Sequence, residues 1–173
     1  MFKIALIGPE SSGKTTLGEA LAIELNAVYV NEYAREYLST KDDSVKNSLQ
    51  DLINIAKKQF NNCKKAEMER PSILICDTEM LTIKIWAEDK FGECPTVIDD
   101  LLRHQSYDLY VLCSPDFPWE DDPLREDKDR REQLYQIYLN YCQNMNLHYI
   151  VSQGDNKIRL NKIKLFLNNL NIN

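Results

Sequence analysis

The stretch Gly8-Pro-Glu-Ser-Ser-Gly-Lys-Thr15 decides the fold, because it matches the pattern G-x-x-x-x-G-K-[S/T]. An apolar run over Lys3–Ile7 precedes this stretch, and leucines recur every fourth residue after it, at Leu17, Leu21 and Leu25. A strand, a glycine loop and a helix in this order bind phosphate, since the loop turns its N–H groups inward and the helix N-terminus attracts negative charge. The sequence therefore predicts a nucleoside triphosphate site near its beginning.

The residues of this loop suit the chemistry of a triphosphate bound with Mg²⁺. Gly8 and Gly13 let the backbone approach the phosphate oxygens closely. Lys14 is expected to reach the β- and γ-phosphates, and the Thr15 hydroxyl to be a ligand of Mg²⁺. The alternative, a glycine turn with a chance lysine, is disfavoured by the strand–loop–helix context. We expect ATP to bind at Gly8, Glu10, Ser11, Ser12, Gly13, Lys14, Thr15 and Thr16.

Later apolar runs have the length of strands that are buried on both faces. Stretches with helical spacing separate these runs, which is typical of a parallel sheet with helical crossovers. The sequence predicts a single α/β domain over residues 1–173, with three layers, a five-stranded, mainly parallel sheet and helices on both faces. The runs are Ala27–Val30, Ile73–Cys76, Leu109–Cys113 and His148–Val151, and the helical stretches include 52–60, 134–141 and 158–170.

The composition excludes several classes of protein. An apolar fraction of 43% and a charged fraction of 28% are ordinary for a globular chain and exclude a largely disordered one. The net charge of −6 argues against nucleic-acid or membrane partners, and no apolar stretch approaches the roughly 20 residues that span a bilayer. The five cysteines form no CxxC pair, so we expect free thiols in a reducing, cytoplasmic compartment.

An acidic residue ends the third apolar run. Asp77 follows Ile73–Cys76 at the end of the predicted strand, and the carboxyl ends of parallel strands are where ligands bind. A phosphate-loop enzyme needs such an acid to hold Mg²⁺ directly or through water, so we predict Mg²⁺ near Thr15 and Asp77. The alternative is an aspartate that caps the next helix.

The segment Asn31–Tyr37, after the second run, combines an acid, an arginine and aromatic rings at the same edge. Glu32 is suited to accept a hydroxyl proton or to bind ribose hydroxyls, and Tyr33 or Tyr37 to stack on a flat ring, with Arg35 beside them. The alternative is a helix with its tyrosines in the core and Arg35 at the surface. Spacing alone leaves open whether Asp77 or Glu32 orients or deprotonates an acceptor hydroxyl.

Residues 114–132 hold three prolines and many charges without periodicity, which is typical of a functional lid. Arg125 and Arg130 are predicted to place positive charge on a transferred phosphoryl group when this lid closes. The alternative is a solvated charge run. Arg131 is set aside, because it cannot easily point in the same direction as its neighbour.

Four segments together resemble the ribosylnicotinamide kinase domain of NadR proteins. They are Gly8–Thr16, Asn31–Leu38, Asp77–Glu79 and Pro115–Arg125, and the resemblance covers nearly the whole chain. The second and fourth segments are far more specific than the phosphate loop, which many families share. The resemblance implies a P-loop kinase fold and transfer of the ATP γ-phosphate to the ribose 5′-hydroxyl of nicotinamide riboside, which gives nicotinamide mononucleotide.

The resemblance carries further expectations. Some members clamp the pyridine with an aromatic residue where this chain has Asn31, so the stacking partner is expected to be Trp86, Tyr33 or Trp119. In P-loop kinases of this shape the loop before the last helix passes the adenine, which gives Gly154 either that role or a simple turn. NadR proteins usually carry an adenylyltransferase domain ahead of the kinase, and this sequence begins at the first kinase strand. We therefore expect it to make the mononucleotide and not NAD.

Two alternatives to this reaction stay open. One is a kinase for a different nucleoside or another small hydroxyl substrate, and the other is a non-catalytic switch that binds a nucleotide. The predicted lid arginines and the aromatic residues near Glu32 favour an enzyme.

Overall fold

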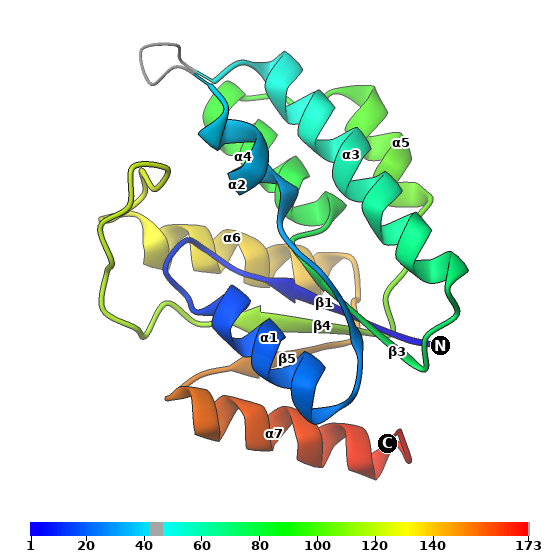
Figure 1. The fold of residues 1–173 in the computed structure, drawn as a ribbon. Helices are drawn as coiled ribbons and strands as arrows, with labels where there is room; N and C mark the ends of the chain where they lie inside the picture. The colour runs from blue at the N-terminus through cyan, green and yellow to red at the C-terminus, as the bar shows by residue number, and fades with distance from the viewer. Residues whose placement is uncertain (42–46, 173) are drawn as a thin grey trace.

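The computed structural model describes residues 1–41 and 47–172, and its centre is a sheet of parallel strands (Figure 1). The strand order is β2-β3-β1-β4-β5, and every pair of neighbours in the described residues is parallel. The prediction of a five-stranded, mainly parallel sheet is confirmed. The strands are β1 (Phe2–Ile7), β2 (Val28–Val30), β3 (Ile73–Asp77), β4 (Leu109–Cys113) and β5 (Tyr149–Ser152).

Helices cover both faces of this sheet, as the alternating pattern predicted. One face packs on α1 and α7, and the other on α3, α4 and α6. The smaller helices α2 and α5 join α3 and α4 in a separate apolar cluster beyond the sheet. In the described part of the chain the helices are α1 (Lys14–Glu24), α2 (Tyr33–Ser39), α3 (Leu49–Met68), α4 (Met80–Phe91), α5 (Thr96–Arg103), α6 (Arg131–Asn144) and α7 (Asn156–Asn169).

The register of the central strands brings the predicted functional segments to one edge of the sheet. Leu6 is opposite Asp77 on β3, and Ile7 is opposite Leu112 on β4. The phosphate loop, the end of β3 and the segment after β4 therefore leave the sheet side by side. This is the edge at which open parallel sheets bind ligands.

Close packing of α1 on the sheet depends on Gly18. A Cβ atom at Gly18 would lie 2.6 Å from the ring of Tyr29 and 2.7 Å from the side chain of Leu6. No side chain fits in that space, so Gly18 has a packing role at this position. The same Tyr29 ring ends in a hydroxyl that donates a hydrogen bond to Asp77.

Two predictions from composition can be compared with the structure. No helix in the described ranges is long and apolar enough to cross a membrane. All five cysteines are free thiols, and only Cys94 is not buried.

Candidate functional site

The loop between β1 and α1 has the shape that phosphate binding requires. Its backbone has positive φ angles at Gly8 (135°) and Gly13 (76°), where glycine is the residue that fits without strain. Lys14 Nζ donates to the carbonyl oxygens of Gly8 and Pro9, both at 2.9 Å, and so arches over the loop. Ser12 Oγ donates to the carbonyl of Pro9 at 2.8 Å and closes the turn from inside. The loop is therefore held in a curved conformation by its own side chains.

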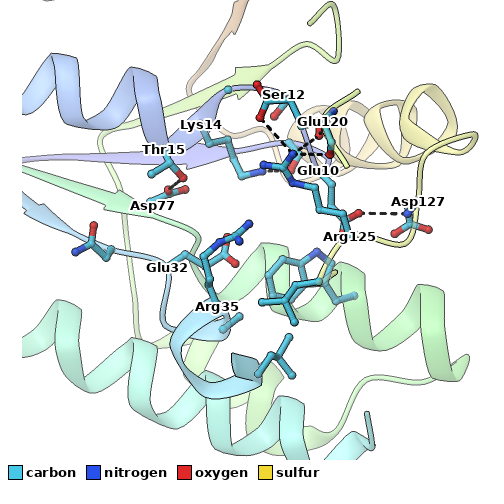
Figure 2. Close-up of a pocket in the computed structure, with 18 of the residues that line it drawn as sticks. Glu10, Ser12, Lys14, Thr15, Glu32, Arg35, Asp77, Glu120, Arg125 and Asp127 are labelled. Atoms are coloured by element: carbon cyan, nitrogen blue, oxygen red, sulfur yellow. Dashed lines mark hydrogen bonds and ion pairs between the residues drawn. The ribbon is translucent and has the colours of Figure 1, made fainter. Parts of the chain in front are cut away.

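The Asp77 carboxylate lies beside the start of α1 and has the environment of a Mg²⁺ ligand. Its Oδ2 accepts a hydrogen bond from Thr15 Oγ1 at 2.7 Å (Figure 2) and another from the Tyr29 hydroxyl at 2.9 Å. Its Oδ1 is buried, and no described residue gives it a hydrogen bond. A buried carboxylate oxygen without a donor is costly unless a cation or ordered water satisfies it. Mg²⁺ typically uses one or two carboxylates together with phosphates and water, so Asp77 and Thr15 fit this ion.

The phosphate loop lines one end of a cavity of ≈ 520 Å³. This volume is in the range that holds a small-molecule ligand. We call the loop residues Gly8–Thr16 with Asp77 the phosphate end of the cavity. The opposite part, called the apolar end, is lined by side chains of α2, α3 and α4, namely Leu38, Leu52, Ile55, Trp86 and Phe91.

Glu32 and Arg35 bring charge to the wall between the two ends. Glu32 precedes α2, and its Oε2 accepts a hydrogen bond from Thr78 Oγ1 at 3.0 Å. Burial raises the pKa of Glu32, and the nearby Lys14 ammonium opposes that rise. Arg35 Nη1 donates to Oδ2 of Asp122, a residue of the predicted lid, at 2.7 Å. A carboxylate with a raised pKa beside the phosphate end can accept a proton from a bound hydroxyl group.

Sequence reasoning missed Gln59, which holds the two acidic segments together. This fully buried side chain accepts a hydrogen bond from the N–H of Tyr33 at 2.8 Å. Its Nε2 donates to the carbonyl oxygens of Asn31 at 3.3 Å and Thr78 at 3.2 Å. Gln59 thereby fixes the backbone on both sides of Glu32. The available signal was a polar amide on the apolar face of a predicted helix, which must find buried partners.

The lid segment, residues 114–130, contains no helix or strand and lies against the phosphate loop. Arg125 lines the cavity, and its Nη1 donates to Ser11 Oγ at 2.8 Å. The structure does not bring Arg130 into the lining: it forms an ion pair with Asp89 of α4 at 2.5 Å. Arg131 instead donates to the carbonyl oxygen of Ser11 at 3.3 Å. Neighbouring arginines do point in different directions, and the one set aside is the one that contacts the loop.

The structure separates the three aromatic candidates for stacking. Trp86 lines the apolar end of the cavity. Tyr33 lies outside the lining, and its ring packs under Lys58 Nζ at 5.9 Å. Trp119 also lies outside, because its Nε1 donates to Asp121 and its ring packs against Arg131. Any binding roles of Tyr33 and Trp119 stay predictions.

At the start of α7, a side chain that the sequence analysis did not name lines the cavity, whereas Gly154, just before the helix, does not line it. The Gly154 N–H donates to Asp116 Oδ2 at 2.5 Å. Asn156, two residues later, does line it. Its Oδ1 is buried, and no described residue gives it a hydrogen bond. Asn156, the first residue of α7, is therefore the side chain at this end of the helix that lines the cavity.

A buried arginine that sequence reasoning also missed supports the phosphate end. Arg159 is fully buried in α7, and it donates to the carbonyl oxygens of Ser12 at 2.6 Å, Ser114 at 2.9 Å and Gly154 at 2.8 Å. It also pairs with Asp116. Because a rigid guanidinium carries several donors, one side chain can join the phosphate loop, the start of the lid segment and α7. The available signal was that Arg159 lies four residues before Ile163, on the apolar face of the predicted last helix.

The cavity can be compared with known proteins. A model of the family described as AAA domain matches residues 3–159. The trifunctional NAD biosynthesis/regulator protein NadR of Escherichia coli is 25% identical over 152 residues, which is 85% of this chain and 37% of that protein. The NadR protein of Salmonella typhimurium is 28% identical over 124 residues, or 70% of this chain and 30% of that protein. The chain thus spans about a third of the length of these curated relatives.

Solved structures share the fold at low identity. A NadR protein in complex with NR has a TM-score of 0.75 and 22% identity, over 89% of this chain and 46% of that one. The thymidylate kinase of Ehrlichia chaffeensis has a TM-score of 0.71 and 19% identity, over 95% of this chain and 97% of that one. The deoxyadenosine kinase of M. mycoides has a TM-score of 0.71 and 18% identity, over 97% and 100%. The arrangement of strands and helices is that of P-loop kinases, and such a fold implies ATP binding.

Proposed function

This chain belongs to the AAA domain family, and from that premise we propose that it is an ATP-dependent kinase for nicotinamide riboside. The reaction moves the γ-phosphate of ATP to the ribose 5′-hydroxyl and yields nicotinamide mononucleotide. The resemblance of four segments to the ribosylnicotinamide kinase domain supports this substrate, and so does the similarity to NadR proteins.

The observation that carries the proposal is the position of Glu32. Its carboxylate stands in the cavity wall between the phosphate end and the apolar end (Figure 2). A nucleoside with its flat base against Trp86 would have its ribose at this carboxylate and its 5′-hydroxyl toward Lys14. Phosphoryl transfer requires little more than such a position and charges that stabilise the transferred group.

Five side chains share the catalytic work in this proposal. Lys14 and Arg125 stabilise the negative charge that spreads over the transferred phosphoryl group. Thr15 and Asp77 would hold Mg²⁺, which neutralises charge on the phosphates when it is bound. Glu32 accepts the hydrogen bond of the 5′-hydroxyl and takes its proton during transfer.

The surroundings of the two acids favour this division of labour. Asp77 already accepts two hydrogen bonds on one oxygen, and its second oxygen is suited to an ion. Glu32 accepts one hydrogen bond, from Thr78, and burial raises its pKa toward the range of an effective base. We therefore assign the base role to Glu32 and the metal role to Asp77.

The direct test is mass spectrometry of the product after the purified chain is incubated with nicotinamide riboside, ATP and Mg²⁺. We expect a product heavier by one phosphoryl group, with ADP in equal amount. Glu32→Gln is expected to lower kcat about 10²–10⁴-fold, which is the usual contribution of a general base. Near-wild-type kcat in that variant would remove Glu32 from the base role.

A second candidate is a kinase for a different nucleoside. The two nucleoside and nucleotide kinases of similar fold are covered by this chain over nearly their whole length. A panel of pyridine, purine and pyrimidine nucleosides under the same conditions separates the two candidates. If the protein phosphorylates other nucleosides but not nicotinamide riboside, the second candidate is favoured.

A further inference from the structure

We propose that Glu10 is a positioning residue that docks the lid segment on the phosphate loop and thereby places Arg125. This inference rests on the proposed kinase function, in which Arg125 faces the transferred phosphate. The sequence places Glu10 among the residues predicted to bind the nucleotide, because it belongs to the phosphate loop. The structure gives its carboxylate a different partner.

The Glu10 carboxylate binds two consecutive N–H groups of the lid segment. Its Oε2 accepts a hydrogen bond from the N–H of Asp127 at 3.2 Å (Figure 2) and another from the N–H of Glu126 at 2.9 Å. Burial raises the pKa of Glu10, whereas these two N–H groups stabilise its charged form. Hydrogen bonds to an ionised group are about twice as strong as neutral ones. Glu10 is thus a fixed point of attachment for the segment that follows Arg125.

The next residue of the loop receives the arginine itself. Ser11 has a φ of 51°, in the left-handed region that few residues other than glycine adopt. Its Oγ accepts from Arg125 Nη1 at 2.8 Å, and its carbonyl oxygen accepts from Arg131 Nη1 at 3.3 Å. Of these two neighbouring loop residues, Ser11 therefore binds Arg125 itself and Glu10 binds the lid segment directly after it. The conformation of the phosphate loop and the position of Arg125 are coupled through these contacts.

Charge gives an independent reason for this role. A carboxylate beside a polyphosphate repels it, and Asp127 adds a second negative charge next to Glu10. An acid at this loop position therefore weakens nucleotide binding, which indicates that Glu10 has a role other than contact with the nucleotide. Two N–H groups of the lid segment need an acceptor here, and Glu10 supplies it.

Loss of the docking contact should let water reach the γ-phosphate, because a closed lid excludes it. The experiment compares wild type, Glu10→Ala, Glu10→Gln and the control Glu132→Ala, which removes an exposed carboxylate at the start of α6. Two quantities are measured with ATP and Mg²⁺. One is the ratio of ADP formed to nucleoside phosphorylated, with whichever nucleoside the protein accepts. The other is the rate of trypsin cleavage within residues 114–130, with a non-hydrolysable ATP analogue bound.

We expect Glu10→Ala to raise both quantities by at least about tenfold, because it removes two charge-assisted hydrogen bonds. Glu10→Gln keeps an acceptor oxygen and should restore most of the difference, and Glu132→Ala should match wild type. Ser11→Ala, which removes one partner of Arg125, carries the same test if Glu10→Ala does not fold. Wild-type values of both quantities in Glu10→Ala, or in Ser11→Ala where that variant is used, would overturn the proposal.

The two readouts separate failure of this inference from failure of the proposed function. Trypsin cleavage of the lid segment needs no acceptor, so it tests docking even if nicotinamide riboside is not the substrate. A wild-type protein that phosphorylates no nucleoside would contradict the proposed function and leave the cleavage comparison intact.

Discussion

The two ends of the cavity are built in different ways. The phosphate end comes from one continuous stretch, Gly8–Thr16, and a single distant acid, Asp77. The apolar end comes from side chains on α2, α3 and α4, which are far apart in the sequence. The backbone N–H groups of the first are suited to phosphate, and the side-chain shape of the second is suited to selecting a ligand. The comparison teaches that the type of reaction is set locally, whereas the choice of acceptor depends on the tertiary structure.

The largest expected effect tests the phosphate end. Lys14→Ala removes the ammonium that arches over the loop and should lower kcat about 10³-fold, because it takes away charge stabilisation in the transition state. The loss should be equal for every nucleoside that serves as acceptor. Steady-state kinetics with two acceptors measure it, and Lys164→Ala, which alters an exposed pair with Glu24, is the control. A loss confined to one acceptor would contradict the division into two ends.

The next effect concerns the framework of the phosphate end. Arg159→Met should reduce the free energy of unfolding by about 3 kcal/mol, because the buried carbonyl oxygens of Ser12 and Ser114 lose their donor. Urea denaturation followed by circular dichroism measures the change. Arg103→Met removes an exposed arginine and should leave stability within about 0.5 kcal/mol of wild type. Equal stability of the two variants would mean that Arg159 does not support the loop.

The elements predicted from the sequence are the ones specified by local patterns. The apolar runs became β1 to β5, and no strand end differs from the predicted one by more than one residue. The helices over Met80–Phe91 and Thr96–Arg103 had no prediction. Met80, Leu81, Thr82, Ile83 and Ile85 are all buried, so α4 has too little polar surface to show a helical period. A helix buried on several sides cannot be recognised from alternation with solvent.

The predicted site residues divide in the same manner. Gly8, Lys14 and Asp77 lie at one edge, because a motif and a strand end fix their positions. The partner of Glu10 and the role of Arg159 depend on contacts across more than a hundred residues. No spacing rule predicts such contacts. The same holds for the neighbours Arg130 and Arg131, because Arg130 pairs with Asp89 and Arg131 donates to the carbonyl oxygen of Ser11.

A smaller effect tests the apolar end. Trp86→Leu should raise KM for the nucleoside about tenfold and leave KM for ATP unchanged, because stacking on an indole contributes about 1.4 kcal/mol. Initial rates at varied concentrations of each substrate separate the two constants. Trp119→Leu removes an indole that lies outside the cavity and is the matched comparison. An equal rise of KM in both variants would show that the apolar end is not where the base binds.

The smallest expected effect concerns the ion pair that joins the lid segment to α2. Asp122 Oδ2 lies 2.7 Å from Arg35 Nη1, and the Arg35 side chain is 53% exposed. Asp122→Asn should therefore raise KM for the nucleoside only two- to threefold, since an exposed pair contributes less than about 1 kcal/mol. The difference from wild type should shrink as KCl is raised from about 0.05 M to about 0.5 M, because salt screens exposed charges.

Asp100→Asn, in an exposed pair with Arg103, controls for the loss of one surface charge. A large change in KM that persists at high salt would mean that this pair belongs to the binding site itself. The boundary between the two ends would then have to be drawn through the lid segment.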